Sequence, residues 1–292
     1  MNTWAPLILL SALTGSLADT ITKYVFKNNP KIGVSYWMVI SWIPEIILLS
    51  VILLATGRVK DLIAIPAFVL VPIIIVSAVK FIGNKGSYTA LKYIPISVVY
   101  ILGLSSTVFT NILGVIIYHE SVTPIKIFGI SLVILSIIIL FYERHHLKHL
   151  FNKYALFVIL SAVFYSIGWL LDKYFGLNID FFIFRFLYSI VNLVIFFMVD
   201  IQEMDRSHKA FNEKPTKLIL PLLAVSFLYF LYAFAYMAAY KDGAEAGKVD
   251  AINNIGVFVV IALEAFILKD RTNLVKKIVA AIICVIGVSL LV

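Results

Sequence analysis

The sequence predicts an all-α integral membrane protein with ten transmembrane helices, arranged as two inverted repeats of five helices each. Three observations lead to this fold class. Only 14% of the 292 residues are charged and 62% are hydrophobic. The apolar residues form stretches long enough to cross a bilayer, and the two halves of the chain resemble each other. A soluble domain is nearer half apolar and a quarter charged, so these few charges could not cover a water-soluble surface.

Ten apolar stretches account for nearly the whole chain. A helix needs roughly 20 apolar residues to cross the hydrocarbon core of a bilayer. Helices are expected because the stretches lack the alternation of membrane strands. The predicted spans are residues 4–26, 34–56, 64–90, 97–118, 123–141, 154–174, 180–200, 217–240, 247–268 and 273–291. No remaining stretch is long enough to form a soluble catalytic domain.

The first span, residues 4–26, is expected to be a retained helix rather than a signal peptide. No basic segment precedes it, it has no clear cleavage site, and Asp19 and Lys23 interrupt its end. These two residues are four positions apart, so they are predicted to pair along one helix face. The single cysteine, Cys284, excludes an intramolecular disulfide.

The two halves of the chain repeat with an offset near 150 residues. The segment Leu10–Tyr24 matches Leu160–Tyr174 at several Leu, Ser, Ala, Lys and Tyr positions. The predicted units are a first repeat at 1–142, a polar linker at 143–153 and a second repeat at 154–292. Because five is an odd number of helices, the second repeat enters the membrane from the opposite face. Secondary transporters often have this inverted topology, with the substrate site at the midplane between the repeats.

The end of each half carries the most specific sequence pattern. It reads IIYHESVTPIKIFGISLVIL in the first half and FILKDRTNLVKKIVAAIICVIG in the second. This pattern resembles the EamA-type transporters of the drug/metabolite transporter superfamily, over essentially the whole chain. The family usually has Glu where Asp270 stands, and glycine is common at the positions of Ser136 and Ala280. The resemblance implies ten helices around a central cavity and transport of small metabolites without ATP hydrolysis.

Ionisable side chains inside the predicted spans are the main candidates for a functional site, because burying one in a bilayer costs roughly 2.5–3.5 kcal/mol. Lys80 and Arg185 are suited to hold a carboxylate or phosphate, Arg185 as a bidentate fork. Glu45 is suited to hold an ammonium group or to exchange a proton. The competing interpretation is that Glu45 pairs with Lys80 or Arg185 and only locks neighbouring helices. The residues predicted to carry a coupling proton are Glu45, Asp19 and Glu264.

Aromatic residues extend the predicted binding site. Tyr229, Tyr232 and Tyr236 are spaced to lie on one helix face, where they would contact an amine by cation–π interaction. The alternative is aromatic packing or an interfacial belt. The complete set of residues predicted to bind substrate is Glu45, Lys80, Asn84, Arg185, Tyr229, Tyr232, Tyr236, Trp169 and Asp250.

The last helix of each half differs from the others. Residues 127–140 and 278–292 contain no ionisable side chain except the thiol of Cys284, and both contain small residues. We predict that they are peripheral packing helices or that they form a homodimer. The alternative is burial of each helix against its own half.

The distribution of Lys and Arg gives one prediction of orientation and the family gives another. Basic residues concentrate in the loops after odd-numbered spans, for example Lys27, Lys31, Arg144, Lys148, Lys209, Lys214, Lys269, Arg271, Lys276 and Lys277. The positive-inside rule places these loops in the cytoplasm and both termini outside. The family resemblance implies both termini inside. The net charge of +8 is interpreted as basic residues flanking membrane spans, and nucleic-acid binding is not expected.

The predicted function is secondary transport of a small polar metabolite by alternating access. The substrate is expected to be an amino acid, a related zwitterion or an organic anion, and a proton is a candidate coupling ion. The expected location is the cell membrane. A phosphorylated or nucleotide-linked substrate is the alternative if Lys80, Lys85 and Arg185 all face the cavity.

Two other classes of function remain. A membrane-embedded enzyme would need carboxylates, histidines or a cysteine on one face, whereas all five histidines lie in or near loops. A static scaffold would have every buried charge paired and no cavity. No cofactor or metal is expected, because His145 and His149 lack a completing set of ligands.

Overall fold

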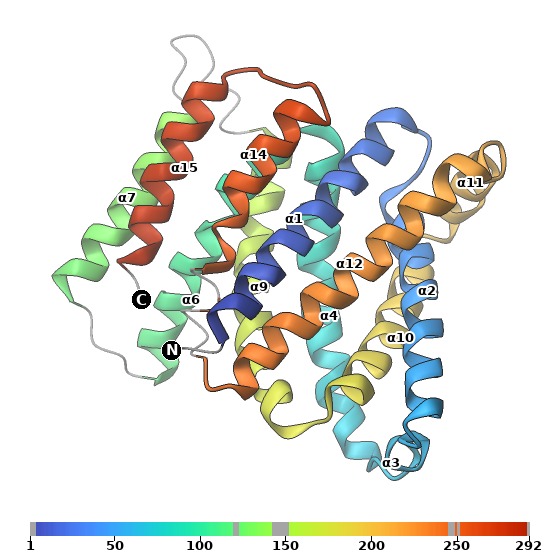
Figure 1. The fold of residues 1–292 in the computed structure, drawn as a ribbon. Helices are drawn as coiled ribbons and strands as arrows, with labels where there is room; N and C mark the ends of the chain where they lie inside the picture. The colour runs from blue at the N-terminus through green and yellow to red at the C-terminus, as the bar shows by residue number, and fades with distance from the viewer. Residues whose placement is uncertain (1–3, 119–122, 142–151, 245–248, 250–251, 291–292) are drawn as a thin grey trace.

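The computed structural model of the protein is all-helical and describes residues 4–118, 123–141, 152–244, 249 and 252–290. Figure 1 shows the helices side by side as one bundle. The helices are α1 (Trp4–Asn28), α2 (Val34–Ala55), α3 (Val59–Ile63), α4 (Ala67–Tyr93), α5 (Ile96–Gly103), α6 (Ser105–Tyr118), α7 (Pro124–Phe141), α9 (Lys153–Asn178), α10 (Phe181–Val199), α11 (Ile201–Asn212), α12 (Pro215–Lys241), α14 (Gly256–Phe266) and α15 (Leu274–Ser289).

Seven helical segments of the described chain are long and apolar enough to cross a membrane. They make this an integral, multi-pass membrane protein. Seven is fewer than the ten predicted spans. The predicted span 97–118 is among the seven, as Ile96–Leu113, although it is broken at Leu104 into α5 and α6. Shorter apolar helices stand at Pro124–Ile139 and Gly256–Phe266.

The main helix contacts run between the two halves of the chain. The most extensive pairs are α1 with α12, α4 with α9, α7 with α15 and α2 with α10. In Figure 1, α7 and α15 lie together at one side, and α2 and α10 lie together at the other. Because each pair joins the first half to the second, the interface between the halves crosses the whole molecule.

The pair α7 and α15 uses its small residues inside the molecule. A Cβ atom added to Gly287 would lie 2.8 Å from the backbone oxygen of Gly129 and 2.9 Å from Cβ of Leu132. Glycine therefore allows these two backbones to approach closely, as small residues do between membrane helices. The two helices pack against each other, across the halves, rather than only against their own half. The homodimer stays a prediction.

Lysines from α1 cap the ends of neighbouring helices. The Lys23 ammonium donates to the backbone carbonyls of Leu91 at 2.8 Å and Ile94 at 2.9 Å, at the end of α4. Lys27 donates to the carbonyl of Leu268 at 2.8 Å. The predicted pair of Asp19 with Lys23 is therefore wrong, because unsatisfied carbonyls at a helix end attract the cation.

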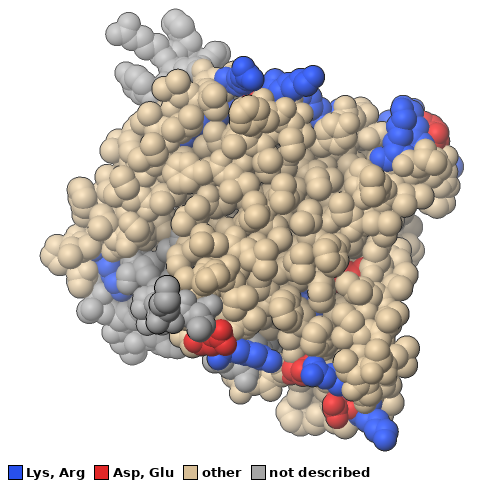
Figure 2. Space-filling model, in the orientation of Figure 1, with Lys and Arg blue, Asp and Glu red and all other residues tan. Residues whose placement is uncertain are grey.

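Charged side chains collect at the two ends of the bundle, and the ends differ. Figure 2 shows more Lys and Arg than Asp and Glu along the end where α1 finishes and α12 begins, and a closer mixture of both signs at the opposite end, which we call the mixed end. At the mixed end, Arg58 pairs with Asp180 at 2.7 Å. The start of α1 and the end of α15 both point toward this mixed end (Figure 1).

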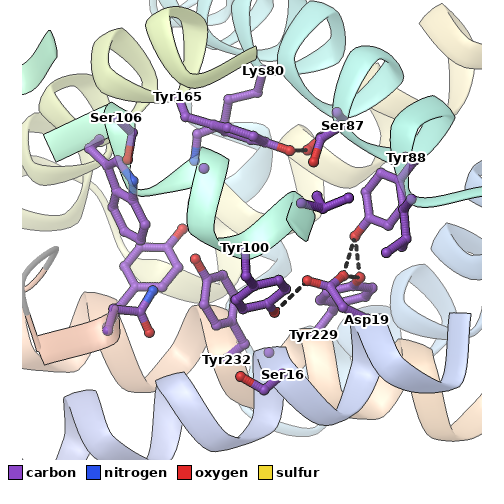
Figure 3. Close-up of a pocket in the computed structure, with 18 of the residues that line it drawn as sticks. Ser16, Asp19, Lys80, Ser87, Tyr88, Tyr100, Ser106, Tyr165, Tyr229 and Tyr232 are labelled. Carbon is purple, nitrogen blue, oxygen red and sulfur yellow. Dashed lines mark hydrogen bonds between the residues drawn. The ribbon is translucent and has the colours of Figure 1, made fainter. Parts of the chain in front are cut away.

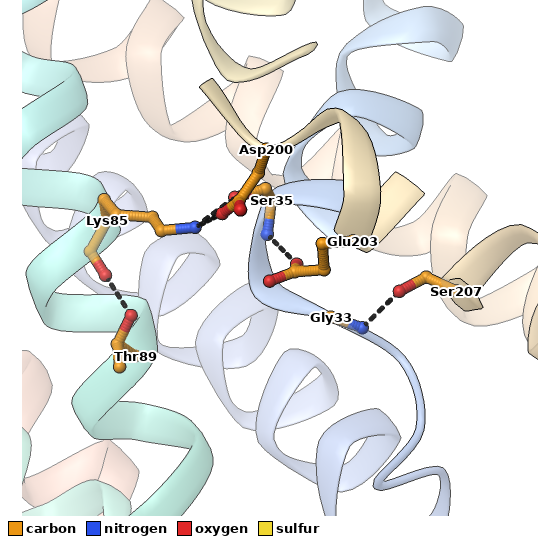
Figure 4. Close-up of polar contacts among 7 residues, drawn as sticks. All are labelled: Gly33, Ser35, Lys85, Thr89, Asp200, Glu203 and Ser207. Carbon is orange, nitrogen blue, oxygen red and sulfur yellow. Dashed lines mark hydrogen bonds and ion pairs between the residues drawn. The ribbon is translucent and has the colours of Figure 1, made fainter. Parts of the chain in front are cut away.

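The amphipathic helix α11 docks across the start of α2 (Figure 4). The N-cap residue of α2, Gly33, has no capping side chain. Instead, the backbone N–H of Gly33 donates to Oγ of Ser207 at 2.9 Å, and that of Ser35 donates to Oε1 of Glu203 at 2.8 Å. Helix α11 thus caps α2 from outside and satisfies two backbone donors that a helix start leaves unpaired.

The carboxylate of Asp200, just before α11, completes this contact. It accepts a hydrogen bond from Oγ of Ser35 at 2.9 Å and forms an ion pair with Lys85. Burial raises the pKa of the Asp200 carboxyl, but the hydrogen bonds from Lys85 and Ser35 outweigh burial and hold this pKa below its usual value.

Candidate functional site

A cavity of about 260 Å³ lies between the two halves of the chain. Its walls come from α1, α2, α4, α5, α6, α9, α10 and α12, together with the residues before α14. The predicted site residues that line it are Asp19, Lys80, Asn84, Trp169, Arg185, Tyr229, Tyr232 and Tyr236. Residues far apart in the sequence are therefore brought to one space, and whether they bind substrate stays a prediction.

Asp19 lies on α1 and is surrounded by phenols (Figure 3). Its Oδ2 atom accepts a hydrogen bond from Tyr100 at 2.6 Å. Its Oδ1 atom accepts one from Tyr88 at 3.1 Å and another from Tyr229. Among the described residues, no lysine, arginine or histidine forms an ion pair with Asp19.

Lys80, on α4, is paired with a carboxylate on α9. Its ammonium contacts Oδ2 of Asp172, which also accepts a hydrogen bond from Tyr236 at 3.0 Å. The Lys80 nitrogen lies 5.6 Å from the ring centre of Tyr188 and 6.0 Å from that of Trp169. The cation is therefore held by one carboxylate inside a ring of aromatic faces.

Arg185, on α10, is paired with Glu45 on α2. Nε of Arg185 donates to Oε1 of Glu45, and Nη2 donates to Oε2 at 3.1 Å, which is a bidentate geometry. The guanidinium carbon lies 5.0 Å from the ring centre of Trp42. Arg185 lines the cavity, whereas Glu45 does not. The predicted alternative, internal pairing of Glu45 with Arg185, is what the structure contains.

The charges at the cavity do not cancel. Glu45 balances Arg185, and Asp172 balances Lys80. Asp19 is the third carboxylate at this site, and the described chain supplies no cation for it. With every group ionised, the site carries one excess negative charge, and that charge is on Asp19.

Two polar atoms in the cavity wall are buried without a hydrogen-bond partner in the described chain. One is the donor Nε1 of Trp42, and the other is the acceptor Oδ1 of Asn253. Buried polar atoms are normally hydrogen-bonded. An unpaired donor and an unpaired acceptor therefore belong to two residues that line this cavity.

Two further residues considered from the sequence, Glu264 and Lys85, do not line the cavity. Glu264 forms a buried ion pair with Lys277 at 3.0 Å between α14 and α15 and does not line the cavity. Lys85 is also absent from the lining and contacts Asp200 instead. Asp250 lies outside the described residues, as do most of the predicted linker 143–153 and the loop histidines. Within the described chain, no group of three or more His, Cys, Asp or Glu residues is placed to hold a metal ion.

Sequence reasoning missed Asp172, Tyr88, Tyr100 and Tyr188. A helical pattern could have indicated Tyr88, because it continues the face of Lys80 and Asn84 at steps of four residues. Asp172 is three residues after Trp169 and shares its face. Nothing in the sequence indicates that Tyr100 reaches Asp19, since the two are 81 positions apart.

Comparison with known proteins now identifies the family. The model of the EamA-like transporter family matches residues 2–142 and again residues 152–292. The chain belongs to the EamA-like transporter family. The two matches show that this family member contains two repeats, which together cover nearly its whole length.

The fold has a counterpart among solved structures. One of them, titled only "Crystal structure of protein", has a TM-score of 0.67 and 11% sequence identity, covering 100% of this chain and 98% of that chain. At this identity the likeness shows the fold alone. No curated protein is significantly similar in sequence.

Proposed function

We propose that this EamA family member is a secondary transporter of a small zwitterionic metabolite of the amino-acid class. The observation that carries the proposal is the cavity of about 260 Å³ between the halves, lined by charges of both signs. Pockets for drug-sized ligands occupy about 300–1,000 Å³. The smaller cavity therefore favours a compact metabolite.

The cationic side of the cavity suits a substrate carboxylate. An ammonium has three hydrogen-bond donors and a guanidinium has five. Lys80 directs one of its donors to Asp172, and Arg185 directs two toward Glu45. Both residues line the cavity, and both keep further donors for a carboxylate, so their internal pairing is compatible with binding.

Alternating access would use the arrangement of the two repeats. We propose ten spans in two repeats of opposite orientation, with α5 and α6 forming one span. The pattern of helix pairs supports this. The first span packs on the eighth and the third on the sixth, which are equivalent pairs when the halves are exchanged. A site between two inverted repeats can open to either side as the repeats rock.

The structure favours this function over the alternatives. A doubly charged phosphate would enter a site whose cations are already neutralised, and Lys85 does not line it. The same balance disfavours an organic anion. A static scaffold would have paired every buried charge and left no cavity, whereas Asp19 lacks a cation partner in the described chain. Glu45 and Glu264 are held by cations, which leaves Asp19 as the remaining candidate for coupling.

The test is uptake of radiolabelled amino acids into proteoliposomes that contain the purified protein. Saturable uptake above that of empty liposomes is expected for at least one amino acid. Replacing Trp42→Phe removes an unpaired donor from the cavity wall but keeps the ring under Arg185, so KM should rise about threefold to tenfold.

Trp37→Phe is the matched control, because the Trp37 indole donates to Thr22 at 3.3 Å and does not line the cavity. It should leave KM unchanged. Absence of uptake for all amino acids would overturn the proposed function. An equal effect of the two substitutions would show that the cavity is not the binding site.

A further inference from the structure

Asp19, Tyr88, Tyr100 and Tyr229 form a cluster on the cavity wall that we call the Asp19 cage. We propose that the Asp19 cage binds the primary ammonium group of an organic amine. This inference rests on the proposed function for the statement that the amine is the transported substrate. The binding site itself is inferred from geometry alone. It narrows the substrate class to molecules that carry an ammonium group.

The first argument is the unbalanced charge. Removing a carboxylate from water is unfavourable unless a cation or several hydrogen bonds compensate it. An ionised carboxylate offers about four acceptor positions. The three phenols of the cage occupy three of them. The fourth position is therefore available to one N–H donor of a bound ammonium.

The second argument is the surrounding chemistry. The Tyr100 hydroxyl donates to Asp19, so its oxygen can still accept from an ammonium. The hydroxyls of Tyr88 and Tyr229 also hydrogen-bond each other, so one of these two oxygens already accepts a hydrogen bond and keeps one lone pair. Tyr232 and Trp169 add aromatic faces to the same cavity. Aromatic faces around a negative centre are typical of sites for organic ammonium ions. A hard metal cation instead prefers a shell of carboxylate, carbonyl and water oxygens.

The third argument is an internal counterpart of the cage. The sequence repeat places Lys80 of α4 opposite Tyr229 of α12 at an offset of 149. On α9, Asp172 holds the Lys80 ammonium among aromatic rings. On α1, Asp19 contacts Tyr229 at the equivalent helix crossing. The two crossings therefore correspond as helix pairs, but Asp19 and Asp172 are 153 positions apart and do not occupy matching positions of the repeat. The α9–α4 crossing encloses an ammonium, whereas the α1–α12 crossing has a tyrosine in place of the lysine.

The experiment measures thermal stabilisation of the detergent-solubilised full-length protein by matched probes. One set comprises L-leucine, isoamylamine, which lacks the carboxylate, and 4-methylpentanoate, which lacks the amine. The second set comprises L-lysine, cadaverine and 6-aminohexanoate. Probes with an ammonium group should stabilise the protein, because they bind only the folded state. The anion 4-methylpentanoate should not.

The variant Asp19→Asn keeps the shape of the side chain and removes its charge. It should weaken the binding of amine probes about tenfold or more. Asp205→Asn is the matched control, because Asp205 is exposed on α11 and pairs with Lys209 at the surface. Tyr100→Phe removes one phenol and should weaken amine binding by a smaller factor.

Four outcomes would overturn the assignment: no stabilisation by any amine probe, stabilisation by 4-methylpentanoate alone, unchanged amine binding in Asp19→Asn, or an Asp19-dependent response to sodium or to acid without any response to amines. The last outcome would make the cage a sodium or proton site.

Failure of this inference and failure of the proposed function are distinguishable. Amino-acid uptake that persists in Asp19→Asn would retain the transport function and remove the ammonium site. Amine binding that depends on Asp19, in a protein that transports none of these probes, would retain the ammonium site and remove the transport function.

Discussion

Two helix crossings in this protein correspond to each other in the repeat, but they differ in whether the buried carboxylate has a cation partner. Where α9 crosses α4, Asp172 is paired with Lys80. Where α1 crosses α12, Asp19 receives only phenols from α4, α5 and α12. The first crossing is complete without a ligand. The second keeps an unbalanced charge on a cavity wall, which is why we propose a ligand there and not at the first crossing.

The largest effect on stability is expected at another closed pair, Glu45 with Arg185. Arg185→Met leaves a buried carboxylate without its cation and should lower the free energy of unfolding by about 3–5 kcal/mol. The double variant Glu45→Gln with Arg185→Met should recover most of this loss. Unfolding of the detergent-solubilised protein by heat or denaturant gives the measurement.

Arg58→Met serves as the control for that prediction. Arg58 pairs with Asp180, but their side chains are 37% and 33% exposed. Partly exposed pairs contribute about 1 kcal/mol or less. If Arg58→Met and Arg185→Met were equally destabilising, burial would not explain the difference between the two pairs.

Removing the cation from the α9–α4 crossing should lower the free energy of unfolding by a smaller amount. Lys80→Met removes the cation from Asp172, but Tyr236 still donates to the carboxylate and the cavity can admit water. A loss of about 1.5–3 kcal/mol is expected, which is the usual contribution of a hydrogen bond to a charged group. Adding Asp172→Asn should restore stability. A double variant less stable than Lys80→Met would contradict the pairing as the reason.

The reverse experiment supplies the Asp19 cage with a cation from the protein itself. Tyr229→Lys copies onto α12 the lysine that α4 carries at the equivalent position. The new ammonium should pair with Asp19, leave stability unchanged or increased, and weaken amine binding about tenfold or more. Tyr229→Phe is the control, since it removes the same hydroxyl without adding a charge. Amine binding that survives in Tyr229→Lys would break the comparison between the two crossings.

The contact between α11 and α2 depends on a carboxylate outside the cavity, that of Glu203, which accepts from the Ser35 N–H. Glu203→Ala removes the cap from the Ser35 N–H and should cost about 1 kcal/mol, as a lost N-cap does. Hydrogen exchange at the start of α2 should increase more than at the start of α10, which Asp180 caps through Phe182. Equal exchange at both helix starts would contradict the capping role of Glu203.

The smallest expected effect is a loss of stability of the α11 contact in acid, caused by protonation of Asp200. Its pKa is lower in the folded protein than the usual value of 3.8. The stabilisation is therefore fully present above that usual pKa and is lost as the pH falls through the lower, folded value. Proteolysis or hydrogen exchange of α11 should rise in this range. Asp200→Asn should remove the dependence, and the exposed Asp205→Asn should not.

Much of the candidate site could be predicted because ionisable residues are rare in membrane spans. Lys80, Arg185 and Asp19 stood out in the sequence for that reason, and all three line the cavity. Their partners could not be fixed from the sequence, although the Glu45–Arg185 pair was one of two pairings that it left open. Asp172 is 92 positions from Lys80, and Glu45 is 140 from Arg185. Local spacing favoured Lys23 as the partner of Asp19, but the end of α4 offered Lys23 carbonyls instead.

The sequence by itself determined that the chain is helical, lies in a membrane and repeats, because hydropathy and periodicity are properties of consecutive residues. It also determined which charged side chains needed an explanation. Only the tertiary structure decided which of those charges cancel and which one remains. That decision depends on distances between helices that are far apart in the chain, and electrostatic interactions in a low-dielectric interior change steeply with such distances.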